Sequence, residues 1–288
     1  MEEVVCVGES SRFSYSVIIP HGKQSGRLLQ CLDSIANQKI HPNLVVVVCN
    51  GSISKFDVTN SIRDDISAYK FKVLVEELRG VSNANVARNY GLGFVIGEWV
   101  VFLDSDDWFD VDWSKHMCQS AVQGNADFIY SSMLIHLKGG ESEVAIAEDY
   151  RLSGTPHNYL LSYKPAQTSG YCVRVELALR IRWDEALLRH QDYDYFVRIV
   201  EAANGVFVNK IPVIHVDWIE QRKHRNFKYC FQVVIPWLDY VEPRIYVRHI
   251  FNLTKLAVRS QDWPAAYIGI KELFCFRYLK SGYDIRNK

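Results

Sequence analysis

The sequence VVFLDSDDW, residues 100–108, joins an apolar strand directly to three carboxylates. Its first four residues have the continuous apolar pattern of a strand that is buried on both faces. Asp104, Asp106 and Asp107 follow at once. Carboxylates this close together repel one another, and removing them from water costs free energy unless a positive charge lies between them. The stretch therefore predicts a buried strand whose end needs a positive partner.

Two interpretations of this acidic stretch are open on its residues alone. In an extended chain, the side chains of Asp104 and Asp106 lie on the same side, about 7 Å apart. Hard oxygen ligands of this kind suit Mg²⁺ or Mn²⁺, which complete their coordination with water and substrate phosphates. Alternatively, the residues form a solvated acidic turn that caps the next helix, because Asp is a favourable N-cap residue.

Outward from this stretch, residues 14–110 alternate strand and helix patterns. Continuous β-branched runs predict buried strands, and apolar residues at helical spacing predict helices. The predicted strands are residues 15–20, 44–52, 71–77 and 98–104, and the predicted helices are residues 25–38 and 82–97, the second ended by Gly97. This order predicts an α/β fold with a mainly parallel central sheet flanked by helices.

Polar residues follow three of the predicted strands, at 21–23, 49–52 and 104–107. In open α/β sheets, ligands bind beyond the carboxyl ends of the strands. We therefore expect the three clusters to face one binding crevice. Ordinary surface turns also end strands, so this alignment alone leaves both interpretations open.

The rest of the chain divides into two segments. Residues 111–220 mix strand patterns at 126–137 and 205–216 with a helix around 192–203. Residues 221–288 have helical spacing, many aromatic residues and a net charge of +8 from 13 Lys/Arg and 5 Asp/Glu, in a chain whose formal net charge is zero. We expect a helical extension divided by Pro236, Pro243 and Pro264. Its charge suits either an anionic surface or a plain solvated helical face.

Composition limits the class of protein. The 288 residues are 48% hydrophobic and 23% charged, as in a globular protein. The N-terminus has no apolar core typical of a signal or transit peptide, and no run of about 18 apolar residues predicts a transmembrane helix. Seven cysteines without a C-x-x-C spacing argue against a disulfide framework or structural zinc site. We therefore expect reduced thiols and a cytoplasmic location.

A second group of carboxylates lies in RHQDYDYF, residues 189–196. Asp192 and Asp194 precede an apolar helix and could do no more than complement its dipole. Asp192 also lies beside His190 and Gln191 among bulky aromatic residues, a setting in which a carboxylate can act as a general base. These residues alone leave both interpretations open.

Five blocks in a fixed order resemble the inverting family 2 glycosyltransferases of the GT-A fold. They are SVIIP with LLQCLDSIANQ, VVVVCNGS, RGVSNANVARNYGL, GEWVVFLDSDDW and IRWDEALLRHQDYDYFVRIV, and together they cover residues 14–218. The resemblance implies a GT-A catalytic domain at 1–220, with a nucleotide-sugar-binding half at 14–110 and an acceptor half at 111–220. The extension at 221–288 lies outside it. Bacterial members of this family often build surface polysaccharides.

The resemblance also implies roles for individual residues. Asp104 and Asp106 would form the metal and ribose-diphosphate motif, with Asp106 the expected direct ligand of Mn²⁺ or Mg²⁺. Asp192 occupies the position of the catalytic base, and His215 falls where some members place a polar residue near the metal. We expect the donor to contact Pro20, His21, Gly22, Cys49, Asn50, Gly51, Ser52, Arg88, Asn89, Asp104, Ser105 and Asp106, and the acceptor to contact Trp108, His190 and Gln191.

These roles imply a metal-dependent direct displacement at the anomeric carbon of a nucleoside-diphosphate sugar, with a UDP-sugar as the first expectation. Asp192 would take the proton from a hydroxyl of a glycan or lipid-linked acceptor. The family commonly has Tyr-Asn where this chain has Gly22-Lys23, Asp-Asp where it has Cys49-Asn50, and Glu where it has Gln191. These departures favour one rival, a degenerate binding protein without turnover. The second rival, a nucleotidyltransferase, would need a phosphate loop of which PHGKQSGR, residues 20–27, is only a faint version.

The helical extension leaves the choice of partner open. Its basic and aromatic residues suit an anionic membrane surface, such as the inner face of the cell membrane. The same aromatic residues could instead pack on the catalytic domain or form a homodimer interface. We expect no nucleic-acid partner.

Overall fold

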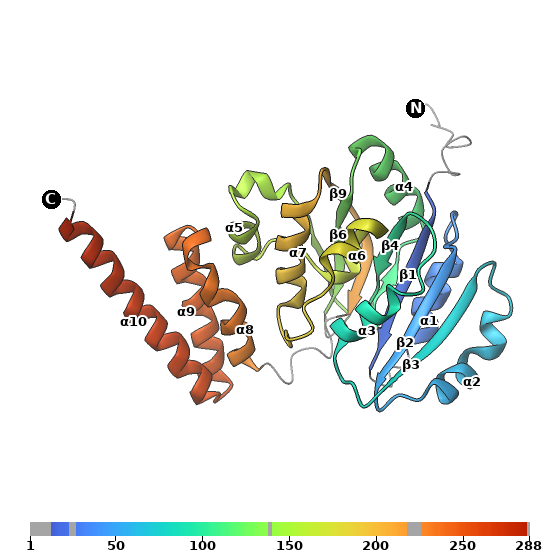
Figure 1. The fold of residues 1–288 in the computed structure, drawn as a ribbon, viewed down its shortest axis with the longest axis horizontal. Coiled ribbons are helices and arrows are strands. Elements are labelled where there is room, and N and C mark those ends of the chain that lie inside the picture. Colours follow the sequence, from blue (N-terminus) through green and yellow to red (C-terminus); the bar gives the residue numbers. More distant parts are fainter. Residues whose placement is uncertain (1–12, 23–26, 138–139, 218–225, 287–288) are drawn as a thin grey trace.

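A computed structural model of the chain describes residues 13–22, 27–137, 140–217 and 226–286 (Figure 1). The extreme N-terminus and the predicted domain boundary at 220/221 lie outside these residues. The predicted α/β class is confirmed: a nine-stranded sheet is flanked by helices and followed by a helical region at the C-terminal end. The strand order along the sheet is β3-β2-β1-β4-β8-β6-β9-β5, and β7 pairs with β6.

The first half of the sheet is parallel. Four strands pair side by side in the order β3-β2-β1-β4, all running in one direction. The elements are β1 (Tyr15–His21), α1 (Leu28–Ala36), β2 (Leu44–Gly51), α2 (Lys55–Ile66), β3 (Lys72–Arg79), α3 (Ala84–Gly91) and β4 (Trp99–Phe102). Because the strands are parallel, their carboxyl ends meet at one edge, as the sequence predicts.

Two features of this half differ from the prediction. The sequence gives little sign of α2, because only Val58 and Ile62 of its twelve residues are buried. Helix α3 ends at Gly91, six residues before the predicted end at Gly97. Gly91 packs so closely on β1 that a Cβ there would lie 2.6 Å from Ile18, and Gly97 takes a φ of +100° in the turn before β4. The predicted end was wrong because one glycine serves packing and the other a turn.

The second half of the sheet is mixed. Strand β8 runs antiparallel between β4 and β6, while β6 and β9 are parallel. The predicted parallel arrangement therefore holds for the first half of the sheet. The elements are β5 (Trp108–Phe109), α4 (Trp113–Gly124), β6 (Phe128–His136), β7 (Ser142–Ala145), α5 (Pro156–Leu161), β8 (Tyr171–Arg174), α6 (Val175–Ile181), α7 (Gln191–Ala202) and β9 (Val206–Asp217), with 3₁₀ turns η1 (Tyr150–Ser153) and η2 (Thr168–Gly170).

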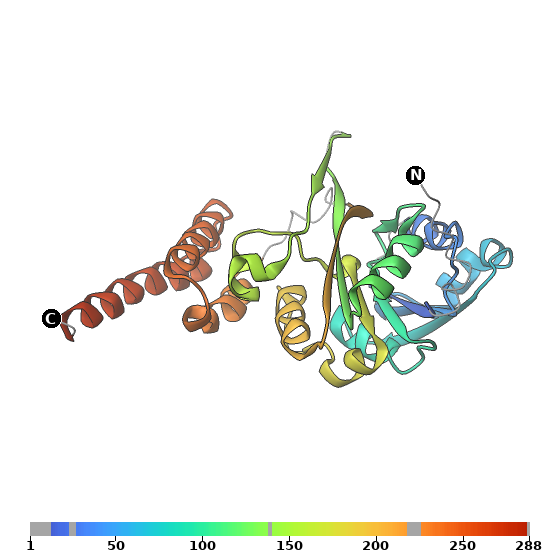
Figure 2. The same cartoon turned by 90° about the horizontal axis from the view of Figure 1, so that it is seen from above.

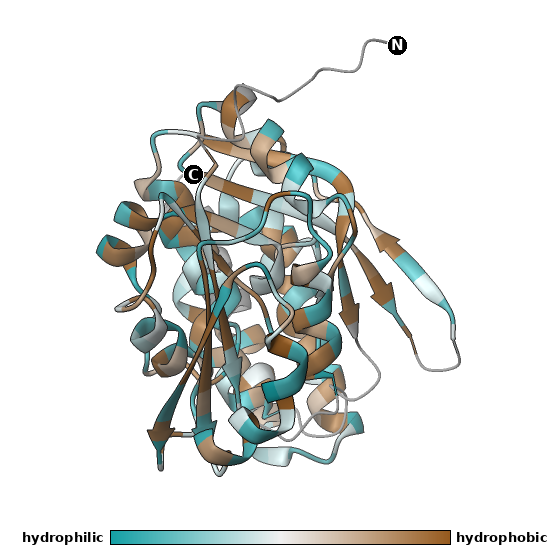
Figure 3. Ribbon diagram, turned by 90° about the vertical axis from the view of Figure 1, so that its right-hand side faces the viewer, coloured by the Kyte–Doolittle hydropathy of each residue, from teal (hydrophilic) through white to brown (hydrophobic). Residues whose placement is uncertain are grey.

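Apolar residues cover both faces of the sheet, because successive strand residues point to opposite sides. On one face, Val17 and Ile19 of β1 join a core with α1 and α4. On the other face, Ile18 joins a second core that includes α6 and α7. Figure 3 shows hydrophobic residues along the strands of the sheet, and Figure 2 shows the helices on either side of it.

The C-terminal region is a small helical unit with its own core. It comprises α8 (Phe227–Val234), the 3₁₀ turn η3 (Ile235–Tyr240), α9 (Pro243–Arg259) and α10 (Trp263–Arg286). The three prolines expected to divide this region lie within the first two residues of η3, α9 and α10. Leu161 of α5 also belongs to this core and thereby attaches the unit to the rest of the protein. None of the described helices is both long and apolar enough to cross a membrane.

Candidate active site

The three carboxylates form a tight loop after β4. The backbone N–H of Asp107 donates to the carbonyl oxygen of Asp104 at 3.0 Å and so closes a turn. The Asp107 side chain is buried and accepts hydrogen bonds from Ser169 Oγ at 2.5 Å and Gln167 Nε2 at 3.4 Å. Asp104 and Asp106 are partly exposed. Asp107 therefore anchors the loop, while the two motif aspartates reach the surface of the site.

Arg88 of α3 supplies a positive charge at the end of β4. Its guanidinium is only 2% exposed and donates from Nη2 to Asp104 Oδ1 at 2.7 Å. It also donates to Asn85 Oδ1 at 3.1 Å and lies 4.6 Å from the centre of the Trp183 ring. Arg88 is predicted from the sequence to lie beside the donor, but no sequence pattern indicates this pairing with Asp104. Arg88 partly answers the need for a cation that the acidic stretch creates.

The acidic loop remains a negative site despite Arg88. Beneath it lies Cys31 of α1, a buried thiol whose pKa is raised well above its usual range, first by burial and then by the charges of Asp107, Asp106 and Asp104. The negative charge of the loop and its carboxylate oxygens suit a divalent cation such as Mg²⁺ or Mn²⁺. No group of three or more His, Cys, Asp or Glu arranged for a metal is found in the described part of the chain.

Asp192 lies at the start of α7 and has a different environment. Burial raises the pKa of its carboxyl to about 6, and the charge of Asp104 adds to this shift. The backbone N–H of Tyr193, which donates to Asp192 Oδ1 at 3.0 Å, and the charge of Arg88 act in the opposite direction. Arg88 and Asp104 are thus near enough to the predicted base to influence the pKa of its carboxyl.

Asp194, the neighbouring carboxylate on α7, forms an ion pair with Arg198. Its Oδ2 accepts from Arg198 at 2.5 Å, one helical turn away. The same guanidinium donates to the backbone carbonyls of Ile181 and Arg182 at 2.8 Å each. Asp194 therefore joins α7 to the end of α6, which leaves Asp192 as the better candidate for a base.

The donor pocket is predicted at the ends of β1 and β2. His21 pairs in register with Cys49, and both side chains are buried. Within the described residues, His21 Nδ1 and Asn50 Oδ1 are buried without a hydrogen-bond partner. A Cβ at Gly22 would lie 3.0 Å from Asn50 Oδ1, so only glycine leaves this amide undisturbed. Two unpaired polar atoms at one strand edge are what a bound polar ligand would satisfy.

Other predicted donor residues have structural contacts. Pro20 and Cys49 are buried within their strands, and Gly51 turns the chain with a φ of +71°. Glu77, the register partner of Cys49 on β3, accepts from the backbone N–H of Lys55 at 2.8 Å and from Arg79 at 2.5 Å. That carboxylate therefore fixes the start of α2. The predicted members Ser52 and Ser105 lie at the surface of the turns after β2 and β4.

Asn89 of α3 forms hydrogen bonds with the segment that precedes Asp192 and α7. Its Nδ2 donates to the carbonyl oxygen of Trp183 and to Glu185 Oε1, both at 2.8 Å, and its Oδ1 accepts from the Trp183 N–H at 2.9 Å. Trp183 in turn stacks on Tyr195 of α7 with a ring separation of 3.9 Å. Asn89 is thus tied to α7 through Trp183.

His215, the predicted metal residue on β9, lies opposite Trp108 of β5 in an aromatic group. The Trp108 ring stacks with His136 at 4.8 Å and with His215 at 5.2 Å. His215 Nδ1 is 3.0 Å from His136 Nε2, and its Nε2 is 3.5 Å from Asp110 Oδ2. Both ring nitrogens of His215 therefore have partners beside the acidic loop. The predicted acceptor residue His190 stacks on Tyr193 at 4.7 Å and precedes Gln191, the first residue of α7.

Three residues of the site were missed by the sequence analysis. Ser169 donates to Asp107 and accepts from the backbone N–H of Asp104 at 3.2 Å. Tyr171 donates to the backbone carbonyl of Asp192 at 3.2 Å. The guanidinium of Arg88 lies over the ring of Trp183. Trp183 lies in the block IRWDEALL and could have been noticed there. Ser169 lies in a segment without periodicity and gave no signal.

Comparison with known proteins provides an independent view of the chain. A family model described as glycosyl transferase family 2 matches residues 16–172. The amylovoran biosynthesis glycosyltransferase AmsB of Erwinia amylovora is 27% identical over 254 residues, covering 83% of this chain and 81% of its own length. The poly(ribitol-phosphate) beta-glucosyltransferase of Bacillus spizizenii is 29% identical over 97 residues, or 32% of this chain and 15% of its own.

Solved structures share the fold. The structure of S. aureus TarS 1-349 in complex with UDP has a TM-score of 0.60 at 20% identity, and the match covers 83% of this chain and 66% of that one. The same protein in complex with UDP-GlcNAc has a TM-score of 0.61 at 20% identity and is covered to 67%. This chain thus spans about two thirds of the TarS fragment.

Proposed function

The chain belongs to glycosyl transferase family 2, and we propose that it moves a sugar from a nucleoside-diphosphate sugar to an acceptor hydroxyl with inversion at the anomeric carbon. The family assignment agrees with the resemblance in the sequence and makes the protein a glycosyltransferase of the GT-A type. The observation that carries the proposal is Asp192, a carboxyl with a raised pKa beside Arg88 and Asp104.

Asp192 acts as the general base in this proposal. A carboxylate whose pKa is about 6 is ionised at neutral pH and yet holds a proton better than an ordinary aspartate. It takes the proton from an acceptor hydroxyl while that oxygen attacks the anomeric carbon, opposite the leaving nucleoside diphosphate. One displacement inverts the configuration, so an α-linked donor gives a β-linked product. The hydrogen bond from Tyr193 N–H orients the carboxylate.

Asp106 and Asp104 would hold the divalent cation, Mn²⁺ or Mg²⁺, together with the donor diphosphate. When bound, the cation stabilises negative charge on the leaving group. Arg88 holds Asp104 in place through its hydrogen bond, and Ser169 and Gln167 fix the loop through Asp107. His215 would contribute only if it gave up its contact with Asp110 or His136.

The donor is proposed to be a UDP-sugar held by residues of the 14–110 half. TarS, which shares the fold, has been solved with UDP and with UDP-GlcNAc. His21 and Asn50 offer polar atoms to the nucleotide, and Asn50 presents an amide where family members commonly have a carboxylate. We expect weaker preference for uridine over other bases than a carboxylate would give, and calorimetry with UDP, GDP and ADP would measure it. A strong uridine preference would point to another base contact.

The acceptor is proposed to be a growing glycan or a lipid-linked saccharide in surface polysaccharide synthesis. The relative AmsB is named for amylovoran biosynthesis, and it matches along most of both chains. The acceptor would approach Asp192 past Trp108, His190 and Gln191, residues that lie on β5 and at the start of α7.

One assay separates this proposal from its rivals. The protein is incubated with nucleotide sugars, acceptor saccharides and Mn²⁺, and the released nucleotide is identified. A glycosyltransferase releases nucleoside diphosphate as glycoside forms. A binding protein binds the donor without release. A nucleotidyltransferase releases no nucleoside diphosphate in this mixture but forms pyrophosphate in a parallel incubation with nucleoside triphosphate and a sugar 1-phosphate. Either result would overturn the proposal.

The helical unit is proposed to contact an anionic membrane surface near the acceptor. Exposed residues of α9 at helical spacing include four cations, Arg244, Arg248, Lys255 and Arg259. Exposed residues of α10 at helical spacing include four apolar or aromatic side chains, Trp263, Tyr267, Ile270 and Phe274. Cations attract anionic lipid, with about 1 kcal/mol for each basic residue near the surface, and aromatic side chains settle at the interface.

Liposome flotation tests this surface. The full-length protein is expected to float with anionic liposomes at low salt and to be released at high salt, because charges at the surface are screened. Replacing Trp263 and Phe274 by Ser should weaken binding, whereas neutral liposomes should bind little protein. Protein that ignores anionic liposomes but forms a dimer that these substitutions dissolve would assign the surface to self-association instead.

A further inference from the structure

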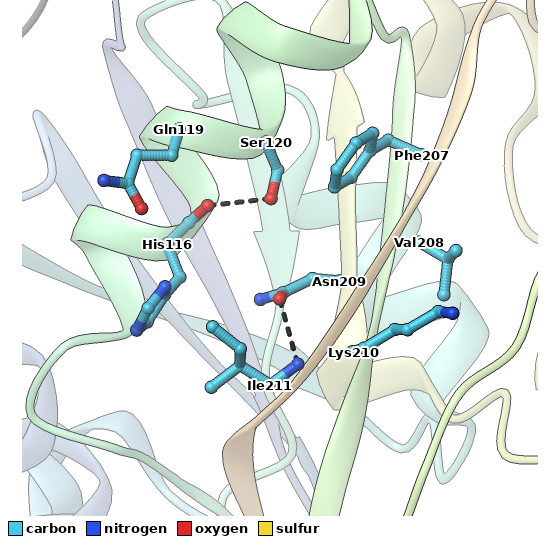
Figure 4. Close-up of a pocket in the computed structure, with 8 residues that line it drawn as sticks. All are labelled: His116, Gln119, Ser120, Phe207, Val208, Asn209, Lys210 and Ile211. Carbon is cyan, nitrogen blue, oxygen red and sulfur yellow. Dashed lines mark hydrogen bonds between the residues drawn. The ribbon is translucent and has the colours of Figure 1, made fainter.

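A cavity of about 350 Å³ lies between α4 and the first half of β9 (Figure 4). This volume is at the lower end of the roughly 300–1,000 Å³ typical of small-molecule sites. None of its lining residues belongs to the acidic loop, the donor pocket or α7. It is therefore a separate hollow that the proposed reaction leaves without a role.

A β-bulge in β9 forms one wall of the cavity. Ser131 of β6 pairs with Asn209, but the next residue, Ser132, pairs with Pro212, so Lys210 and Ile211 are extra residues in β9. Bulges re-aim side chains and are common near binding sites. Asn209 supports this bulge because its Oδ1 accepts a hydrogen bond from the Ile211 N–H at 3.1 Å. The amide oxygen of Asn209 thus has a hydrogen-bond partner, which leaves the amide nitrogen to be considered.

The amide nitrogen of Asn209 points to a missing partner. The side chain is only 5% exposed, and its Nδ2 is buried without a hydrogen-bond partner among the described residues. Leaving a buried donor unsatisfied costs about 1–3 kcal/mol. Figure 4 shows this amide on the side of β9 that faces α4, together with the side chains of His116 and Ser120. An oxygen acceptor on a ligand in the cavity would remove that cost.

The walls combine neutral polar groups with apolar surface. Gln119 contributes an amide, and the Ser120 hydroxyl donates to the backbone carbonyl of His116 at 2.8 Å, which leaves its lone pairs as acceptors. Burial lowers the pKa of His116, so its ring is neutral and can both donate and accept. Phe207 and Ile211 supply apolar surface, while Lys210 extends from the other side of the strand (Figure 4).

We propose that this cavity is a second saccharide-binding site, which holds a neutral sugar unit of the acceptor glycan. Amides, a hydroxyl and a neutral imidazole can bind several sugar hydroxyls, and the apolar wall suits the C–H face of a sugar ring. Charged ligands fit less well, because no carboxylate lines the hollow and its one lysine is directed away. The saccharide class follows from these walls alone, whereas its role as acceptor rests on the proposed function.

The position of the cavity suits a glycan that reaches the catalytic site. Through the register of β6 and β8, Asn209 lies nearly level with the end of β4. Three strand spacings separate β9 from β4, or about 14 Å. Further along β9, His215 and its neighbour Trp108 border the proposed acceptor path. Because α4 and α7 cover opposite faces of the sheet, a chain of sugars bound in the cavity would have to pass the sheet edge beyond β4 to present another unit to Asp192.

Saturation-transfer NMR with the methyl glycosides of glucose, galactose and N-acetylglucosamine tests the site directly. At least one of these probes should bind the full-length protein, and Asn209→Leu and Gln119→Ala should each weaken that binding. The expected loss is about 3- to 10-fold, the worth of one hydrogen bond. Lys210→Ala should bind as the parent does, because Lys210 extends away from the hollow. Gln119 is partly exposed on α4, so its variant should fold even if Asn209→Leu does not.

Two results would overturn the proposal. One is that none of the three glycosides binds, which would mean that water alone fills the cavity. The other is that binding persists unchanged in a folded Gln119→Ala protein. Kinetics separate the acceptor role from the catalytic proposal: Gln119→Ala should raise KM for an oligosaccharide acceptor about 3- to 10-fold, with kcat and donor hydrolysis unchanged. If no transfer is found at all, the catalytic proposal fails while glycoside binding still decides the saccharide site.

Discussion

The acidic loop after β4 and the first turn of α7 both carry carboxylates, but the contacts of these carboxylates differ. Asp104 pairs with Arg88 at 2.7 Å, and Asp107 accepts hydrogen bonds from Ser169 and Gln167. A guanidinium and two hydrogen-bond donors therefore hold these two carboxylates in place. Asp192 gains one hydrogen bond from Tyr193 N–H, and burial nevertheless raises the pKa of its carboxyl to about 6.

This difference suits the two groups of carboxylates to two different functions. A carboxylate fixed by a cation and by hydrogen-bond donors is suited to bind a ligand in a defined position, while one with a raised pKa is suited to accept a proton. Arg88 connects the two groups, because it pairs with Asp104 and also lowers the pKa of Asp192. Each variant should impair either ligand binding by the acidic loop or proton acceptance by Asp192 and leave the other function intact.

The largest effect is expected from Asp106→Ala. Removing the expected metal ligand should abolish both metal-dependent binding of nucleoside diphosphate and sugar transfer, while the fold survives because Asp106 lies in a partly exposed turn. Calorimetry with UDP and Mn²⁺ measures the binding. The matched control is Asp112→Ala, which removes a partly exposed carboxylate paired with Lys39. Normal metal-dependent binding in Asp106→Ala would show that the loop does not hold the cation.

Asp192→Asn should remove turnover and leave donor binding intact. The amide has nearly the same shape but cannot take the proton, so kcat should fall about 10²–10⁴-fold. Titration with UDP should give the parental affinity. The control is Asp194→Asn, which breaks the pair with Arg198 but touches no proposed catalytic group. Transfer at the parental rate by Asp192→Asn would place the base elsewhere.

Arg88→Met tests the connection between the two groups. It leaves Asp104 without its guanidinium partner, and because Asp104 stays partly exposed we expect a stability loss of about 2–3 kcal/mol, less than for a fully buried pair. The pKa of Asp192 should also rise, since Arg88 lowers it. Chemical denaturation measures the stability change.

Arg174→Met is the matched control for this variant. Arg174 also pairs with a carboxylate, Glu98, and lies 4.5 Å from the centre of the Trp99 ring, but on the surface. An exposed pair of this kind contributes about 1 kcal/mol or less. Equal losses in the two variants would mean that the Arg88 contact is no more than an ordinary surface pair.

A smaller effect is expected on stability from Asp192→Asn. Below pH 4, Asp192 is protonated whether the chain is folded or unfolded, so it adds no pH-dependent cost. Between pH 4 and about 6 the unfolded chain ionises first, and the folded protein loses up to roughly 2 kcal/mol of stability as pH rises. The variant should therefore be more stable than the parent at pH 7, and by much less at pH 4. Equal stability at both pH values would contradict the raised pKa.

The same contrast explains how much the sequence could predict. The parallel half of the sheet follows from the continuous apolar runs of β1, β2 and β4, because each run is a strand with both faces buried. The acidic loop was also predicted, since strand ends at one sheet edge gather their side chains. The mixed half was not, because β8 has only four residues and inserts between strands that are distant in sequence.

Long-range partners account for the rest of the site. Asn89 matches the family pattern, yet its amide contacts Trp183 and Glu185, more than 90 positions away. Ser169 supports Asp107 from a 3₁₀ turn without any repeating pattern. Such contacts form between segments that are far apart in the sequence. The local periodicity of apolar residues therefore cannot predict them.

The pH dependence of kcat/KM for sugar transfer tests the role of Asp192 most directly. Because Asp192 must be ionised to accept the proton, kcat/KM should fall about tenfold per pH unit below about pH 6, and the residual activity of Asp192→Asn should lack this decline. Folding must be checked by circular dichroism at each pH. A parental profile that stays flat down to pH 4.5 would contradict a base with a raised pKa and thereby the assignment of Asp192.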